Sequence, residues 1–210
     1  MSEATANAHV SAQPDAEARS IDNQKTAMWL YLASEVIIFS VFIAAYVIFR
    51  HNDPETVHHV HDSLGLAGIL LISFNTFLLL ASSWSMVMGL RQIQKGDAAG
   101  LMRWLGMTAL LGTLFVVIQY YEYDVLTGKG VSLRFVSGSE FEGFGMHFYT
   151  PTAFHGAHVI VGVLWCLMVI RRASKGRYSA RNYVGVEIFG LYWHFVDVVW
   201  IMLFTLIYLI

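Results

Sequence analysis

The sequence predicts an all-α, polytopic membrane protein in which five transmembrane helices form a bundle. Hydrophobic residues make up 56% of the 210 residues, and the mean hydropathy is +0.55. Charged residues make up only 13%, whereas soluble domains carry about a quarter. The apolar residues gather in five segments, each near or above the roughly 20 residues that cross a bilayer as a helix. The alternating pattern of a membrane β-barrel is absent, so we expect helices.

The chain divides into a polar tail and a membrane domain. Residues 1–26 are polar and rich in Ala and Ser, without the pattern of a signal peptide, and we expect a disordered tail. Residues 27–210 form the membrane domain. Its five expected spans are residues 27–49, 64–90, 102–126, 146–170 and 184–208.

The first span contains an ionisable residue, Glu35, in the run "LYLASEVIIFS". It lies about eight residues into the span, or roughly 12 Å by helix rise. A carboxyl at this depth is expected to be protonated, or held by a partner or a lipid headgroup. Two interpretations stay open: a neutral acid bonded to a neighbouring helix, and a functional carboxyl that faces lipid or exchanges protons.

The second and third spans carry polar residues that ordinary packing explains. Asn75 and three nearby serines in "NTFLLLASSWS" suit close contact between helices. Glu122 lies some 20 residues into a span that starts at the opposite face. It is therefore expected near the outer interface, within reach of water or headgroups.

The fourth and fifth spans contain histidines at helical spacing. His155 and His158 are three residues apart and share a helix face, and so do His194 and Asp197. Glu187 lies on the same stripe as His194, close to the inner end of its span. By helix rise, His158 and His194 lie at similar depths, about 15–18 Å from the cytoplasmic ends. Neighbouring helices can therefore bring them together.

Such a cluster can be interpreted in two ways. It can bind a metal, or it can join helices by hydrogen bonds worth about 0.6–2 kcal/mol each. Spacing alone favours the second interpretation, because the Glu-x-x-His pairs of di-iron bundles are missing. The single cysteine, Cys166, excludes a thiolate metal site. A histidine-rich segment at residues 50–63 is expected to be a solvated external loop. We therefore expect no metal ligand and no catalytic residue.

The distribution of basic residues predicts the orientation. With five spans, the N-terminal tail and the segments 91–103 and 171–183 share one side and carry ten Lys and Arg residues. The opposite side carries three. Basic residues stay in the cytoplasm, so the N-terminus is expected to be cytoplasmic and the C-terminus periplasmic. The net charge of −2, without a basic stripe, gives no indication of nucleic-acid binding.

Five motifs in this chain resemble, in order, those of subunit III of haem–copper terminal oxidases. The resemblance runs through all five spans, over about residues 27–210. The motifs are "YLASEVIIFSVFIAAY" (31–46), "NTFLLLASSWS" (75–85), "QYYEY" (119–123), "TAFHGAHVIVG" (152–162) and "YWHFVDVVW" (192–200).

The resemblance implies an accessory, non-catalytic subunit of a proton-pumping oxidase in the aerobic respiratory chain of a bacterial inner membrane. This family carries no cofactor; haem and copper lie in the partner subunits I and II. A small subunit IV and a respiratory supercomplex are further partners of such oxidases. The family binds phospholipid, stabilises the catalytic subunit and supports proton uptake. The electron donor is cytochrome c or quinol.

The resemblance also implies roles for single residues. Glu35 matches an intramembrane glutamate that reacts with carbodiimide. Arg172 falls where the family has an arginine that binds a lipid phosphate. The positions that match residues holding helices together are His155, His158, Glu187, His194 and Asp197.

The chain departs from the family pattern in three places. Many members have seven helices, so the first two are missing here, and a partner subunit is a candidate source of them. Asn182 and Tyr183 stand where some members have a histidine pair, and the segment 127–145 is longer than expected. Three alternatives stay open. They are an accessory subunit of nitric oxide reductase, an intramembrane haem or metal protein built on the histidines, and a proton-coupled transporter using Glu35 and Asp197.

Overall fold

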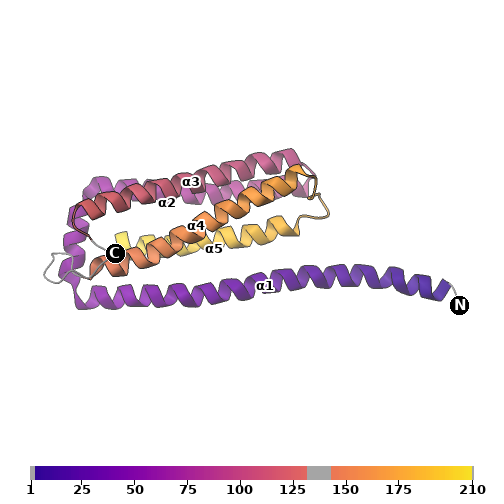
Figure 1. Cartoon of the computed structure of the whole chain (residues 1–210), viewed down its shortest axis with the longest axis horizontal. Helices are drawn as coiled ribbons and strands as arrows, with labels where there is room; N and C mark the ends of the chain where they lie inside the picture. Colours follow the sequence, from indigo (N-terminus) through magenta and orange to yellow (C-terminus); the bar gives the residue numbers. More distant parts are fainter. Residues whose placement is uncertain (1–2, 132–142, 210) are drawn as a thin grey trace.

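Five long helices make up the described chain (Figure 1). The structure is a computed structural model that describes residues 3–131 and 143–209, with the side chains of residues 19–57, 65–131 and 143–209. The helices are α1 (Glu3–Asn52), α2 (Pro54–Gln94), α3 (Ala98–Gly128), α4 (Phe144–Ser174) and α5 (Val184–Phe204), and a π-helical turn, Thr205–Leu209, extends α5.

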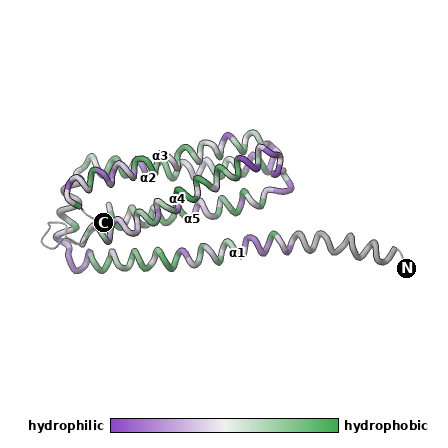
Figure 2. Tube along the Cα trace, in the orientation of Figure 1, coloured by the Kyte–Doolittle hydropathy of each residue, from purple (hydrophilic) through white to green (hydrophobic). Residues whose placement is uncertain are grey.

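The prediction of five apolar helices is confirmed. Each helix is long and apolar enough to cross a membrane, and hydrophobic residues dominate their middle portions (Figure 2). The helices exceed the expected spans at most of their ends. The largest difference is in α1, which begins at Glu3 rather than near residue 27 and projects beyond the bundle (Figure 1). Hydropathy marks only the part of a helix that lipid can hold, so polar turns beyond it escape such a prediction.

The expected loop over residues 50–63 is wrong, because helix occupies almost all of it. Only Asp53 separates α1 from α2. Its carboxylate accepts from the Thr56 backbone N–H at 3.2 Å and from the Thr56 hydroxyl at 2.7 Å. This cap, followed by Pro54 at the first helical position, is a strong start signal. The helix then bends at Gly65, whose φ of 62° suits glycine, so the first turns of α2 cross the end of the bundle (Figure 1).

A tryptophan on α5 lies at the centre of the bundle. Trp193 is 1% exposed, and its ring packs against Gly112 of α3 and Gly162 of α4. A Cβ atom added at Gly112 would lie 2.7 Å from the ring, and one at Gly162 would lie 2.6 Å from it. Glycine is therefore required at both positions, because any side chain would displace the ring. Gly156, by contrast, has no atom within 4 Å of such a Cβ.

Hydrogen bonds join α5 to α2 inside the bundle. The indole N–H of Trp193 donates to Ser82 Oγ at 2.9 Å, and that of Trp200 donates to Thr76 Oγ1 at 3.0 Å. Each hydroxyl in turn donates to a carbonyl of its own helix. Because lipid offers no partner for an indole N–H, these bonds fix the register of the two helices. The outer helix, α1, packs mainly on α4 and α5.

Candidate functional site

Glu35 of α1 lies against a histidine of α4. Its Oε2 is 3.3 Å from His158 Nε2, and both side chains are largely buried, with exposed fractions of 10% and 12%. His158 Nδ1 lies 2.8 Å from the backbone carbonyl oxygen of Phe154. The carbonyl can only accept, so Nδ1 carries a proton. The rings of Phe39 and Phe154 pack against the imidazole.

With Nδ1–H directed at Phe154, Nε2 is the ring nitrogen left for Glu35. The two groups lie close together, although Glu35 Oε2 makes no hydrogen bond within the described residues. A polar neighbour lowers the cost of burying a carboxyl. Of the two partners considered for this acid, neighbouring helix or headgroup, the described residues therefore supply the helix.

His155 lies in an aromatic cage. It is fully buried, stacks on Trp200 with ring centroids 5.0 Å apart, and meets the ring of Phe115 edge-on at 5.8 Å. Within the described residues neither ring nitrogen makes a hydrogen bond. The ring therefore fills space between α3, α4 and α5 as a flat aromatic would.

His194 and Asp197 of α5 face α2. His194 Nδ1 is 3.2 Å from Ser83 Oγ. Asp197 is 6% exposed, and its Oδ1 has no hydrogen-bond partner in the described part of the chain. Ser83 is one of the three serines of the second span. From the sequence we expected these serines to serve close helix packing, and not to bond His194.

The histidines that neighbouring helices could have brought together thus have different partners. His158 turns to α1, His155 to an aromatic cage and His194 to α2. Among the residues whose side chains are described, no group of three or more His, Cys, Asp or Glu is placed to hold a metal ion. The side chains of His58, His59 and His61 lie outside the described residues. Cys166 is buried, and its thiol lies 3.3 Å from the carbonyl oxygen of Leu105.

Two acids near helix ends have protein partners. Glu122, expected within reach of water or headgroups, is only 5% exposed, and its Oε1 accepts from the Tyr208 hydroxyl at 2.6 Å. Tyr208 belongs to the π-helical turn Thr205–Leu209, which covers it. Glu187 Oε2 pairs with Lys25 Nζ at 2.9 Å. Lys25 belongs to the segment expected to be a disordered tail, so nothing in its local sequence indicated this contact.

Asn75 and Ser85 join α2 to α3. The Asn75 side-chain amide donates to the Phe115 carbonyl oxygen at 3.3 Å, and Ser85 Oγ donates to the Trp104 carbonyl oxygen at 2.8 Å. Both acceptors are backbone atoms, which hydropathy patterns do not reveal. These bonds agree with the packing role expected for this span.

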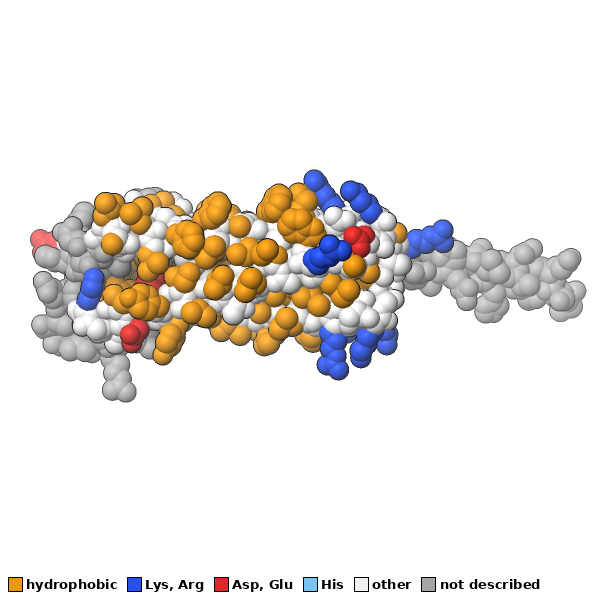
Figure 3. All heavy atoms as spheres, turned by 90° about the horizontal axis from the view of Figure 1, so that it is seen from above, with side chains coloured by type: hydrophobic (Ala, Val, Ile, Leu, Met, Phe, Trp, Pro, Cys, Tyr) orange, Lys and Arg blue, Asp and Glu red, His pale blue; other side chains and the backbone are white. Residues whose placement is uncertain are grey.

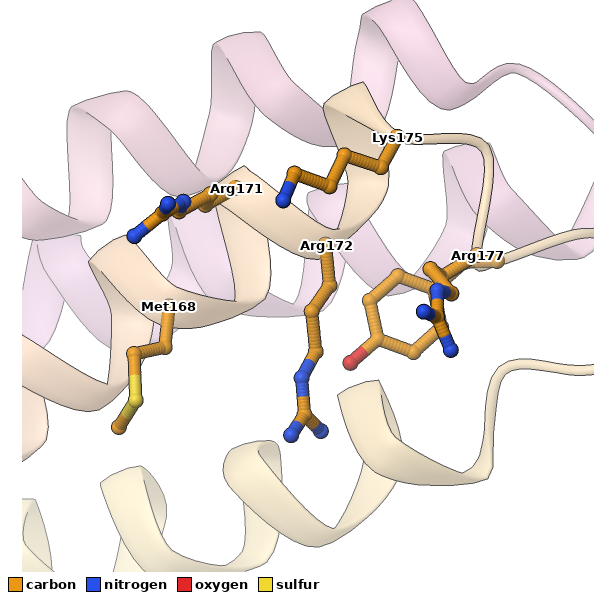
Figure 4. Close-up of a pocket in the computed structure, with 6 residues that line it drawn as sticks. Met168, Arg171, Arg172, Lys175 and Arg177 are labelled. Carbon is orange, nitrogen blue, oxygen red and sulfur yellow. The ribbon is translucent and has the colours of Figure 1, made fainter.

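Arg172 lies in a basic hollow at the end of α4. A cavity of about 530 Å³ is lined by four basic residues together with Met168 and Tyr178. The basic residues are Arg171, Arg172, Lys175 and Arg177. Arg172 extends from α4 toward α5, while Arg171 and Lys175 follow the other side of α4 (Figure 4). None of its described lining residues is an acid, so the cavity can hold an anion. Arg172 also lines a second cavity, of about 440 Å³, that reaches α1 at Tyr31.

Comparison with known proteins finds similarity to one family over most of the chain. The family model described as cytochrome c oxidase subunit III matches residues 12–210. Cytochrome c oxidase subunit 3 of Synechocystis sp. is 40% identical over 86% of this chain and 73% of its own length. Cytochrome c oxidase subunit 3 of Thermostichus vulcanus is 36% identical over 90% of this chain and 88% of its own length. Cytochrome bo(3) ubiquinol oxidase subunit 3 of Buchnera aphidicola is 33% identical over 86% of this chain and 88% of its own length.

Proposed function

The chain belongs to the cytochrome c oxidase subunit III family, and on that premise we propose that it is the accessory, cofactor-free subunit of a proton-pumping haem–copper oxidase. Its role is to stabilise a redox-active partner in the aerobic respiratory chain. The observation that carries this proposal is that His155, His158 and His194 contact different groups of the protein itself rather than one another. Relatives named for cytochrome c and for ubiquinol oxidases both match, so either donor fits.

The partners in this proposal are oxidase subunits I and II, with a small subunit IV and a supercomplex as further neighbours, in a bacterial cytoplasmic membrane. The basic residues support an N-terminus in the cytoplasm, because most of them gather at one end of the bundle (Figure 3), the end beyond which α1 extends toward the N-terminus (Figure 1). A predominantly apolar band follows (Figure 3). The C-terminus then lies on the periplasmic side.

A phospholipid is the ligand that the basic hollow at Arg172 fits. Under the proposed orientation the hollow lies at the cytoplasmic interface, where headgroup phosphates are found. A guanidinium binds phosphate by paired hydrogen bonds, and the second cavity at Arg172 leads along α1 toward Tyr31. Acyl chains can follow that path into the bilayer.

Glu35 and His158 are the groups through which the subunit would influence protons. They lie 3.3 Å apart inside the membrane-spanning part of the bundle, and Glu35 keeps 10% of its side chain exposed. The pair also joins α1 to α4. Support of proton uptake through this pair and α1 is therefore part of the proposal.

Purification of the full chain from its native membrane in mild detergent tests the proposed function. We expect redox-active oxidase subunits to co-purify with it and to account for the haem absorbance and copper of the preparation. After the complex is dissociated, the separated chain should hold neither. Haem or stoichiometric metal on the separated chain, or a monomer with no such partner, would contradict the proposal.

A further inference from the structure

A groove runs along the outside of α5 between α1 and α2. It consists of two adjoining cavities of about 350 Å³ and about 440 Å³, which share Trp29, Leu191 and His194. The Lys25–Glu187 ion pair lines one end, and Val36 and Val198 line the other. We call this surface the α1–α2 groove. It exists because α1 packs on α4 and α5 and has few contacts with α2.

A histidine lines this apolar groove, and one of its ring nitrogens has no partner among the described residues. His194 lies ten residues beyond the start of α5 at Val184, or about 15 Å into the bilayer. Its Nδ1 is engaged by Ser83, whereas Nε2 makes no hydrogen bond within the described residues. Besides the ion pair at the groove's end, the hydrogen-bonding side chains among the lining residues are Trp29 and His194. Trp29 lies one helical turn from Lys25, close to the interface, whereas His194 lies deeper. Leaving such a group unpaired costs about 1–3 kcal/mol.

The depth of His194 decides which occupant fits. An acyl chain fills apolar space but has no group that can bond an imidazole. The polar part of a phospholipid stays at the interface, about 15 Å from Nε2 by helix rise. A protein helix can place a hydroxyl, amide or backbone carbonyl at this depth, as interhelical bonds in membranes do.

Two other faces of the bundle do not present a polar atom at this depth. The exposed face of α3 presents Leu110, Leu114 and Val117, which lipid tails can cover without loss. The surface around Arg172 is lined by basic side chains, which suit an anionic ligand. The α1–α2 groove is therefore the described surface where an apolar hollow and an unpaired mid-membrane polar atom coincide.

We propose that the α1–α2 groove docks a transmembrane helix of the redox-active partner subunit, and that a hydrogen bond to His194 Nε2 sets its register. This inference rests on the proposed function and adds to it the docking face and the residue that positions the partner. The walls of the groove, Trp29 at 60%, Val36 at 51% and Val198 at 57% exposed, would become buried on docking.

Photo-crosslinking in the assembled oxidase tests the docking face. Benzoylphenylalanine is placed at Val198 in the groove and, as a matched control, at Leu110 on α3. The two sites lie at similar depths, about 21 and 18 Å from their helix starts, and have similar exposure. We expect Val198 to give an adduct with a transmembrane segment of the partner, identified by mass spectrometry, and Leu110 to give none. Lipid adducts alone, adducts with a second copy, or equal yields from both sites would overturn the inference.

Substitution of His194 tests the hydrogen bond. His194→Leu should weaken retention of the partner in detergent at least about five-fold, equivalent to about 1 kcal/mol. His194→Gln should keep most of it, because the Gln amide reaches the position of Nε2. Equal retention by both variants would overturn the register role. If the unsubstituted chain retains no oxidase subunit, the proposed function itself fails, so the two failures are distinguishable.

Discussion

At the scale of single residues, burial in lipid makes every polar side chain find a partner or lose stability. Glu35 illustrates this, because its carboxyl lies among apolar residues and is matched by His158 at 3.3 Å. A polar neighbour on another helix lowers the cost of burying this carboxyl. The sequence indicated an acid at this depth, and three-dimensional packing selected its partner.

Glu35→Gln should abolish labelling of this chain by a lipid-soluble carbodiimide, because the reagent needs a protonated carboxyl reachable from lipid. Mass spectrometry of the labelled chain measures the effect. Glu122→Gln is the control, since Glu122 is 5% exposed and bonded to Tyr208; that variant should still be labelled. Persistent labelling of the Glu35→Gln chain would refute the assignment.

At the scale of helices, small residues decide which faces can meet. Trp193 of α5 enters the bundle between Gly112 and Gly162, and its N–H is bonded to Ser82 of α2. One side chain therefore contacts all of the inner helices. Neither glycine is distinguished in the sequence from Gly156, whose environment is open.

Gly162→Ala should destabilise the bundle, whereas Gly156→Ala should not. An added methyl at Gly162 would lie 2.6 Å from the Trp193 ring, and overpacking of this kind costs about 1–3 kcal/mol. Both variants gain the same helix propensity, up to about 1 kcal/mol, so their difference isolates the packing effect. Unfolding of the purified complex in detergent measures it. Equal stability of the two variants would contradict the packing described for Trp193.

At the scale of the whole molecule, charge and hydropathy define how the bundle lies in a membrane. Lys and Arg gather at one end and apolar side chains cover the length between the ends (Figure 3). The ion pair between Lys25 and Glu187 joins α1 to α5 near that basic end.

Cysteine accessibility should place the basic end in the cytoplasm. A membrane-impermeant maleimide should label Ser179→Cys only in inverted vesicles and Lys129→Cys only in intact cells, because the two positions lie at opposite ends of the bundle. The native Cys166 is 0% exposed and should give little background. The reverse pattern of labelling would overturn the orientation.

Much of the fold could be predicted from the sequence, because lipid restricts a chain to a few forms. Five apolar runs of sufficient length predict five helices. The ends of the helices were harder to predict. Polar turns extend α1 before residue 27, and α2 begins directly after Asp53, and hydropathy indicates neither. The candidate site was predictable only as a set of residues. Spacing placed His155 and His158 on one helix, but their partners come from other helices.

The sequence by itself determined the class of the protein, its five spans and its membership in a family, since these depend on composition and local order along the chain. The tertiary structure alone decided that His158 meets Glu35, that His194 meets Ser83, and that His194 lines a groove between α1 and α2. The physical reason is that hydropathy acts along each segment, whereas a hydrogen bond depends on the rotation and depth of two helices packed together.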